Sequence, residues 1–245
     1  MPDMEDERFA QSVILLVGHG DEGAMGLVVN HELEHLRFAD VINELDLGDP
    51  DSVIRLPDAI RQRAVMRGGP VEKGRGFVLH SPDYKSGNTY PVAGGVSLTA
   101  TLDVLKAVAF GPAPQASLFA LGCCGWSPGQ LEGEIGSNGW LTAPFSRELL
   151  FETPVEQRYD AALASLHITR ATLSRQLLAE FRSGHRRAKG IALGIAAIER
   201  AQPVELILAF HALGNDHQVQ VAGQRHDRLD DGRLGVGDAI AFAQF

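Results

Sequence analysis

Two apolar runs rich in β-branched residues stand close together near the start of the chain, at residues 12–17 (SVILLV) and 26–30 (GLVVN). The short connection between them contains glycine, which is typical of two strands that pair with each other. Similar apolar runs follow at residues 64–81, where a Gly-Pro turn separates two of them, at 89–100 and at 116–125. These runs predict a domain built around a sheet.

Helical spacing of apolar residues appears between and after these strands. Residues 36–47 place their apolar side chains on one face of a helix, and residues 101–111 (TLDVLKAVAFG) predict a short helix. Ser127 followed by Pro128 is a helix-start signal and predicts a helix from about Gln130. Residues 148–183 are also mostly helical in pattern.

Composition restricts the class of protein. The chain has 245 residues with a net charge of −9, which argues against a surface that follows nucleic-acid phosphates with Lys and Arg. The acidic N-terminus does not resemble a secretory signal. Charged residues and a proline interrupt residues 189–210, so this apolar stretch falls short of the roughly 20 residues of a membrane span. We expect a cytoplasmic protein that does not bind a membrane.

Five long runs identify a family by resemblance. They are residues 6–30, 67–81 (RGGPVEKGRGFVLHS), 97–114, 120–144 (ALGCCGWSPGQLEGEIGSNGWLTAP) and 149–166. In these runs the chain resembles the AlgH/YqgE family of bacterial proteins. The resemblance implies an α+β fold, in which a bifurcated, mostly antiparallel sheet folds into a pseudo-barrel with helices packed outside. It also implies a role in transcriptional regulation.

The sequence departs from the family pattern in three places. A first strand is expected before Met1, and an assigned start that is too late would explain its absence. Cys123 and Cys124 replace the Tyr-Ala of the family. The family domain is expected to span residues 1–184, so that residues 185–245 form a C-terminal extension, either a fused segment or a reading-frame artefact.

Residues 122–141 (GCCGWSPGQLEGEIGSNGWL) hold both cysteines and both tryptophans of the chain. Adjacent cysteines cannot easily share one metal ion, and with no other cysteine they exclude a disulfide framework. Glycines permit a sharp turn between a strand and a helix, and the tryptophans are apolar anchors. The two glutamates could act as acid and base, but no nucleophile or matched histidine stands nearby in sequence. We therefore interpret the stretch as a packed corner with a polar rim.

This corner is the best candidate for a contact with a ligand or partner. The candidate surface comprises Asn30, Gly68, Gly69, His80, Trp126, Gln130, Glu132, Glu134 and Trp140. His80 is better explained as a structural histidine than as a ligand. No cofactor is expected, and the partner is an unidentified protein or small molecule.

Residues 31–35 (HELEH) match the zinc-hydrolase motif H-E-x-x-H. In that chemistry His31 and His35 would bind zinc from one helix face while Glu32 activates a water molecule. The motif follows a predicted strand, however, and the next predicted helix begins only near Leu36. We therefore expect a loop here and no metal site.

Residues 168–189 (ITRATLSRQLLAEFRSGHRRAK) are locally basic and resemble half of a helix-turn-helix. DNA recognition requires a companion helix and side chains that reach bases, and an amphipathic surface helix explains the pattern as well. The leading hypothesis is a non-enzymatic regulatory or binding protein that affects transcription indirectly. A zinc hydrolase and direct DNA binding through residues 168–189 are the alternatives.

Overall fold

Ten strands and several short helices make up the described part of the chain. The structure, a computed structural model, describes residues 9–48, 55–92, 94–136, 139–172 and 205–209. The strands are β1 (Val13–Gly20), β2 (Gly23–Val28), β3 (Glu32–Arg37), β4 (Ala64–Arg67), β5 (Val71–His80), β6 (Thr89–Val92), β7 (Val96–Thr99), β8 (Ser117–Trp126), β9 (Trp140–Pro144) and β10 (Glu205–Ala209). The helices are α1 (Phe38–Glu44), α3 (Asp58–Arg61), α4 (Leu102–Phe110), α5 (Gln130–Gly136), α6 (Arg147–Phe151) and α7 (Arg158–Ser165).

The strands join into one mostly antiparallel sheet of barrel-like shape, in the order β6-β7-β5-β8-β2-β1-β10-β9. Strands β3 and β4 branch from this path, and β4 runs parallel to β8. The two ends of the order approach each other, because the ring of Phe145, just after β9, lies against Gly94, just after β6. The expected α+β fold with a bifurcated sheet folded into a pseudo-barrel is confirmed.

The sheet divides along strand β8. Residues 117–121 of β8 pair with β5, and part of the same stretch also pairs with β4, whereas residues 124–126 pair with β2. Gly122 stands between these segments with a φ of +75°. A residue in this left-handed conformation shifts the alternation of side chains. In a regular strand Cys123 would lie on the face opposite to Leu118 and Ala120, because successive side chains alternate. Here all three side chains belong to the same core cluster.

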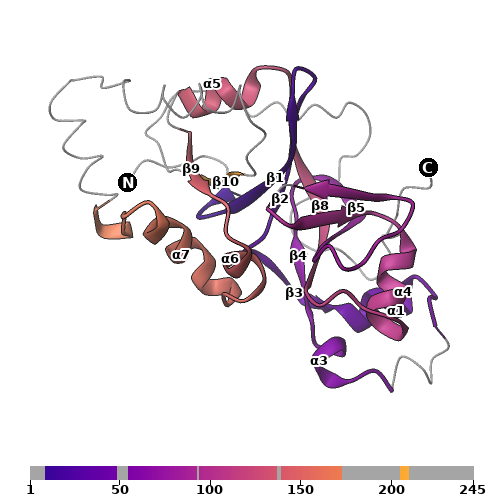
Figure 1. Ribbon diagram of the computed structural model, residues 1–245. Coiled ribbons are helices and arrows are strands. Elements are labelled where there is room, and N and C mark those ends of the chain that lie inside the picture. The colour runs from indigo at the N-terminus through magenta and orange to yellow at the C-terminus, as the bar shows by residue number, and fades with distance from the viewer. Residues whose placement is uncertain (1–8, 49–54, 93, 137–138, 173–204, 210–245) are drawn as a thin grey trace, which may run out of the picture.

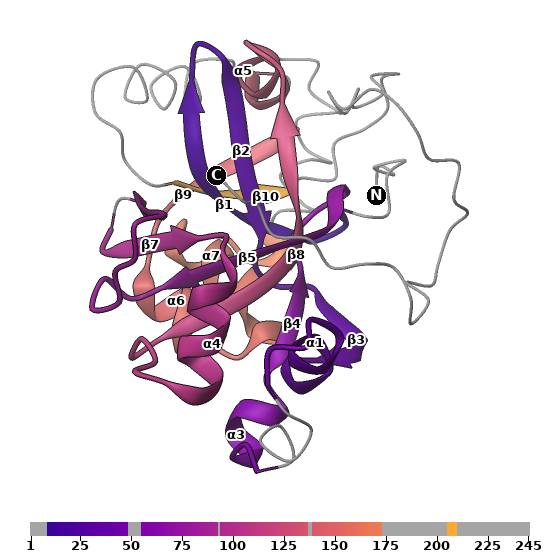
Figure 2. The same cartoon turned by 90° about the vertical axis from the view of Figure 1, so that its right-hand side faces the viewer.

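Helices cover the sheet on separate sides (Figure 1). Helices α1 and α4 pack on β5 and β8 through a cluster that includes Phe38, Leu105 and Phe119. Helices α6 and α7 cover another part of the sheet, where Leu150 and Leu163 enter the main core cluster. Helix α5 stands apart from both groups, beside the tip of the β1–β2 hairpin (Figure 2).

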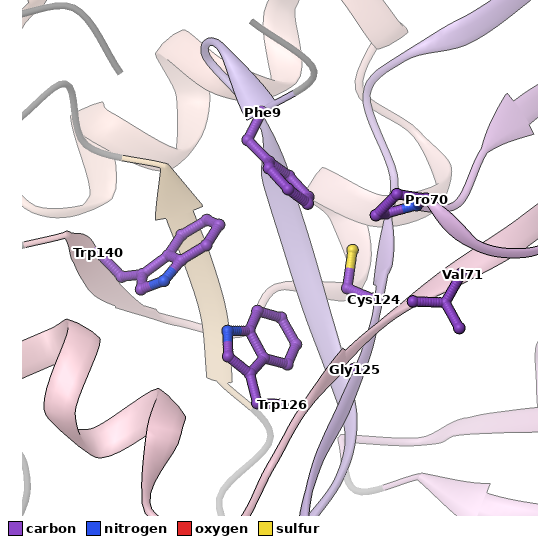
Figure 3. A pocket seen from close by; sticks show the side chains of 7 residues that line it. All are labelled: Phe9, Pro70, Val71, Cys124, Gly125, Trp126 and Trp140. Atoms are coloured by element: carbon purple, nitrogen blue, oxygen red, sulfur yellow. The ribbon is translucent and has the colours of Figure 1, made fainter. Parts of the chain in front are cut away.

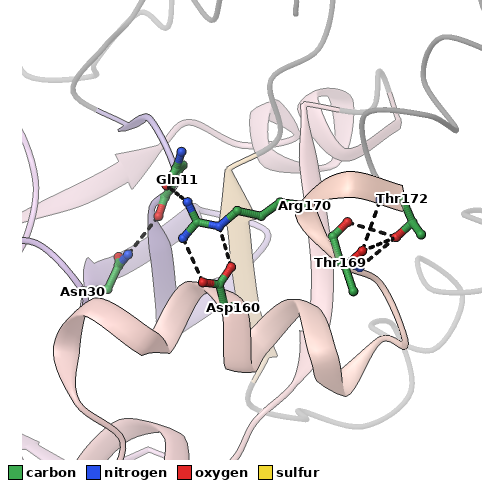
Figure 4. Close-up of polar contacts among 6 residues, drawn as sticks. All are labelled: Gln11, Asn30, Asp160, Thr169, Arg170 and Thr172. Atoms are coloured by element: carbon green, nitrogen blue, oxygen red, sulfur yellow. Dashed lines mark hydrogen bonds and ion pairs between the residues drawn. The ribbon is translucent and has the colours of Figure 1, made fainter.

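Two arginines fix α7 to the start of the sheet. The buried guanidinium of Arg158 donates to the carbonyl oxygens of Val29 and Thr153, and burial lowers its pKa to about 10. Arg170 forms a two-point ion pair with Asp160 and also donates to the side chain of Gln11 at 2.7 Å (Figure 4). No helix within the described residues is long and apolar enough to cross a membrane.

Some predicted boundaries differ from the structure. The helix expected over residues 36–47 spans only Phe38–Glu44, because the residues before it belong to β3. Within the described part of the predicted helical stretch 148–183, α6 and α7 are divided near Pro154, and a further helix begins at Arg170. The division between a domain at residues 1–184 and an extension at 185–245 stays a prediction. Five residues of that extension nevertheless form β10 within the sheet.

Candidate functional site

Helix α5 and the strand ends beside it build a compact aromatic corner. Trp126 ends β8, Trp140 begins β9, and α5 connects the two strands. The helix starts at Gln130, as predicted, and the Gln130 side chain accepts a hydrogen bond from the Ser127 amide at 3.0 Å. Leu131 and Ile135 anchor the helix in the cluster that contains both indoles. The chain therefore leaves the sheet at one tryptophan and re-enters it at the other.

One carboxylate holds both tryptophans. The indole Nε1 atoms of Trp126 and Trp140 donate to the same oxygen of Glu134, at 2.9 and 2.7 Å. The other oxygen of Glu134 accepts a hydrogen bond from the side-chain amide of Gln130 at 2.9 Å. The two indoles meet edge to face with centroids 5.8 Å apart, and both are about 95% buried. Such hydrogen bonds to a charged acceptor are stronger than neutral ones, so Glu134 stabilises the corner, and its oxygens are engaged rather than available as a catalytic base.

A second carboxylate lies on the rim. Glu132 Oε1 lies 2.6 Å from His19 Nε2, which joins α5 to the tip of the β1–β2 hairpin. The His19 side chain is 24% exposed and that of Glu132 37%. Sequence reasoning missed His19, because 113 residues separate it from Glu132. Its place between two glycines in the hairpin was the available signal.

A small hollow opens behind the indoles (Figure 3). Phe9, Pro70, Val71, Cys124, Gly125, Trp126 and Trp140 line it. Its volume of about 10 Å³ is close to that of one water molecule, whereas pockets for small ligands usually measure about 300–1,000 Å³. Phe9, also missed in the sequence, closes the corner by packing edge to face on Trp140. This hollow therefore does not hold a small-molecule ligand.

Gly68 and Gly69 lie at a backbone crossing beside the corner. A Cβ at Gly68 would lie 2.2 Å from the carbonyl oxygen of Gly122, and one at Gly69 would lie 2.2 Å from Cys123. The backbone N–H of Gly68 donates to the carbonyl oxygen of Leu121 at 2.7 Å. The carbonyl oxygen of Gly68 accepts a hydrogen bond from the backbone N–H of Val28 at 2.8 Å. Both glycines are buried, and they permit the approach of two backbones.

Asn30 and His80 lie away from the corner. Asn30 bridges the Val13 amide and the Gln11 carbonyl, which fixes the entry of β1 (Figure 4). His80 is fully buried between the Ser81 carbonyl and the Thr99 hydroxyl, at 2.8 and 2.9 Å. Burial lowers the pKa of His80, which favours a neutral ring that donates through Nδ1 and accepts through Nε2. Of the predicted surface, the structure thus brings together Trp126, Gln130, Glu132, Glu134 and Trp140.

The two cysteines point into different parts of the core. Cys123 packs in the main cluster and Cys124 in the cluster beneath α5. Burial raises the pKa of the Cys123 thiol to about 11 and raises that of Cys124 further. Because the thiolate is the reactive form of cysteine, both thiols are poor nucleophiles at neutral pH.

We expect both thiols to resist a disulfide reagent in the native protein. At pH 8 a thiol with a pKa of about 11 is ionised in roughly one molecule in a thousand, and burial blocks access. Titration with Ellman's reagent should show slow labelling in buffer and rapid labelling of both cysteines in denaturing urea. Rapid native labelling that is lost in Cys123→Ala would contradict this expectation.

Four of the five HELEH residues, Glu32–His35, belong to strand β3, and His31 lies just before it, which corrects the expected loop at these four residues and leaves no helix to carry the zinc motif. Strand β3 begins at Glu32 and pairs with β4, and residues four apart in a strand are separated by about 13 Å. His31 and His35 cannot then both approach a zinc ion to the required distance of about 2 Å. Across the described ranges, no group of three or more His, Cys, Asp or Glu side chains could hold a metal ion.

The basic segment at 168–189 lies mostly outside the described residues. Within the part described, Thr169 and Thr172 exchange hydrogen bonds at a helix start, and Arg170 is engaged by Asp160. Arg170 is therefore committed to a contact within the protein.

Comparison with known proteins settles the family. A family model described as AlgH-like matches residues 1–171, well over half of the chain. The chain belongs to the AlgH-like family. The resemblance read from the five sequence runs is confirmed.

AlgH-like relatives match the chain over most of their length. UPF0301 proteins of Rhizobium meliloti and Mesorhizobium japonicum are each 48% identical over 174 residues, covering 71% of this chain and 86% of theirs. The solution structure of the AlgH protein from Pseudomonas aeruginosa is 40% identical with a TM-score of 0.58, over 71% of this chain and 88% of that one. Strand β10 lies beyond the residues that the AlgH-like family model matches.

Proposed function

We propose that this AlgH-like chain is a non-enzymatic regulatory protein that binds a protein partner through the rim of the aromatic corner. The observation that carries the proposal is that both carboxylate oxygens of Glu134 accept hydrogen bonds from within the corner. A general base needs a free oxygen within reach of a substrate proton, but both oxygens of Glu134 accept hydrogen bonds from side chains of the same corner. The corner is thus built as a rigid support for the surface above it.

The surface above the corner is acidic. Glu132 lies on α5, and Asp21 and Glu22 are exposed at the adjoining hairpin tip. Such a cluster repels nucleic-acid phosphates and attracts Lys and Arg on a protein partner. This charge supports an indirect effect on transcription, exerted through a protein with a basic contact surface.

Charge reversal at the hairpin tip tests the proposal. Proteins captured from native cells by the wild-type chain would be identified, and their dissociation constants measured against purified variants. We expect Asp21→Lys/Glu22→Lys to weaken the relevant partner on the order of tenfold, mainly through slower association at low salt. His19, Glu132 and Glu134 remain intact in this variant, so the corner itself is preserved.

A matched control carries the same change of net charge elsewhere. Glu44 in α1 and Glu152 after α6 are exposed, and both helices lie away from α5 (Figure 1). The Glu44→Lys/Glu152→Lys variant should retain wild-type affinity. Equal affinity of every captured partner for all three proteins would reject the rim as the contact surface.

A further inference from the structure

A chain of hydroxyl groups crosses the end of the sheet that β5, β7 and β6 form. Thr99 of β7 is level with Thr89 of β6 and stands diagonally to His80 of β5. His80 Nε2 lies 2.9 Å from the Thr99 hydroxyl oxygen, which in turn lies 2.9 Å from that of Thr89. Ser86, in the loop between β5 and β6, extends the chain, since its hydroxyl oxygen lies 3.2 Å from that of Thr89. Side-chain hydrogen bonds therefore link three neighbouring strands to this loop.

The neutral form of His80 fixes the direction of every hydrogen bond in the chain. Its Nδ1 lies 2.8 Å from the Ser81 carbonyl oxygen, which can only accept, so Nδ1 carries the proton and Nε2 accepts. The Thr99 hydroxyl then donates to Nε2 and accepts from the Thr89 hydroxyl. Because Thr89 has used its only hydrogen, the Ser86 hydroxyl donates to it, as the Ser86 amide also does at 3.0 Å. A second proton on the ring would place two donors face to face unless every hydroxyl turned.

Burial of His80 disfavours its charged form. The residue is 0% exposed, and burial lowers its pKa despite the opposing effects of the Ser81 carbonyl and the Asp83 carboxylate. Asp83 is exposed, and one of its oxygens accepts from the Gln115 amide at 3.0 Å. Its negative charge is therefore partly engaged and screened by water, and it does not offset the cost of charging a buried ring.

The other elements around the ring do not supply a compensating charge. Tyr84 lies edge to face on His80 with centroids 5.4 Å apart, and burial together with Asp103 of α4 raises the pKa of Tyr84. On β8, Ser117 is level with His80 and accepts a hydrogen bond from the Arg63 guanidinium at 2.6 Å. A cation on this side disfavours a second positive charge. No residue of β7 is charged.

The segment that covers His80 is attached at the margin of the sheet. Residues 84–92, which we call the flap, run from Tyr84 through the loop into β6. Among the described strands β6 is the last in the sheet order and pairs only with β7. Lys85 and Gly87 in the loop are exposed, and Tyr84 is half-buried. Local opening occurs most readily in such marginal, solvent-exposed elements, and lifting the flap would let water reach the His80 ring.

We propose that His80 is an acid-sensitive latch: the neutral ring holds the flap closed through Thr99 and Thr89, and protonation of the ring releases it. Because burial lowers the pKa of His80 below its ordinary value of 6.5, the open form binds the proton more readily than the closed form. The stabilisation that the latch provides is therefore complete above about pH 6.5 and is lost as the pH falls below this value. The latch lies outside the aromatic corner and does not depend on the function proposed above.

Amide hydrogen exchange of the full chain at pH 7.5 and pH 5.5 tests the latch. Protection is expressed relative to the intrinsic exchange rate at each pH, because the exchange chemistry itself depends on pH. We expect protection of residues 86–90 to fall about three- to tenfold at pH 5.5, where the upper limit follows from a pKa of about 6.5 in the open form. Protection of residues 13–15 in β1 should change much less. His35→Gln, which replaces an exposed histidine of β3, should reproduce the wild-type result.

His80→Gln provides the decisive variant. Glutamine keeps an oxygen that can accept from Thr99 but takes up no proton in this range, so protection of its flap should be the same at both pH values. Equal flap protection at both pH values in the wild type would overturn the proposal. A loss as large in β1 as in the flap, or a loss that persists undiminished in His80→Gln, would overturn it as well. If His80→Gln does not fold, long-range ¹H–¹⁵N NMR of the wild type decides, because a neutral His80 with its proton on Nε2 would contradict the latch.

Discussion

Replacement of Gly122 by alanine should destabilise the domain by at least about 3 kcal/mol, a large part of the 5–15 kcal/mol that usually separates folded from unfolded domains. Gly122 has a φ of +75°, and a Cβ there would lie 2.6 Å from the carbonyl oxygen of Gly69. The left-handed conformation alone costs an L-residue about 1–2 kcal/mol. The clash adds to this, because it involves backbone on both sides and no side chain can rotate away.

Gly125 provides a matched control on the same strand. A Cβ at Gly125 would have no atom within 4 Å, and its φ is not positive. Gly125→Ala should therefore change stability by less than about 0.5 kcal/mol. Urea unfolding followed by far-UV circular dichroism measures both variants. Equal midpoints for Gly122→Ala and Gly125→Ala would show that the division of the sheet does not depend on the conformation of Gly122.

Truncation of Trp126 to alanine should cost about 3–5 kcal/mol, as large aromatic truncations in cores do. The indole is 95% buried, contacts Trp140 edge to face and donates to Glu134. Its loss leaves a cavity beneath α5 and removes one of the three donors to the carboxylate. A loss below about 1 kcal/mol in urea unfolding would contradict the packed-corner interpretation.

Trp126→Phe separates packing from hydrogen bonding. The phenyl ring retains much of the buried apolar surface but cannot donate to Glu134, so the cost should be about 1–3 kcal/mol, the usual penalty for an unsatisfied buried group. If both substitutions destabilise the protein equally, the hydrogen bond rather than the ring holds the corner together.

Local signals predicted the elements that depend on local sequence. β-branched runs marked β1 and β2, and Ser127 before Pro128 marked the start of α5 at Gln130. HELEH was harder, because its literal motif suggests a helix, whereas its pairing with β4 makes it a strand. Strand propensity depends on such neighbours, and they lie more than 25 residues away.

Long-range pairing determined what the sequence did not predict. The contact between His19 and Glu132 joins elements 113 residues apart, and no local pattern encodes it. The pairing of β10 with β1 and β9 likewise depends on two unsatisfied edges that only the folded sheet presents. The resemblance predicted the fold but could not place a strand that lies outside the matched residues.

The aromatic corner also determines what the protein's intrinsic fluorescence reports. Both tryptophans of the chain lie in this one corner, 5.8 Å apart and bonded to the same carboxylate. Tryptophan emission is therefore a probe of α5 and the ends of β8 and β9, rather than an average over the molecule. An emission change that precedes the loss of circular dichroism during unfolding would reveal this corner opening while the rest of the sheet stays folded.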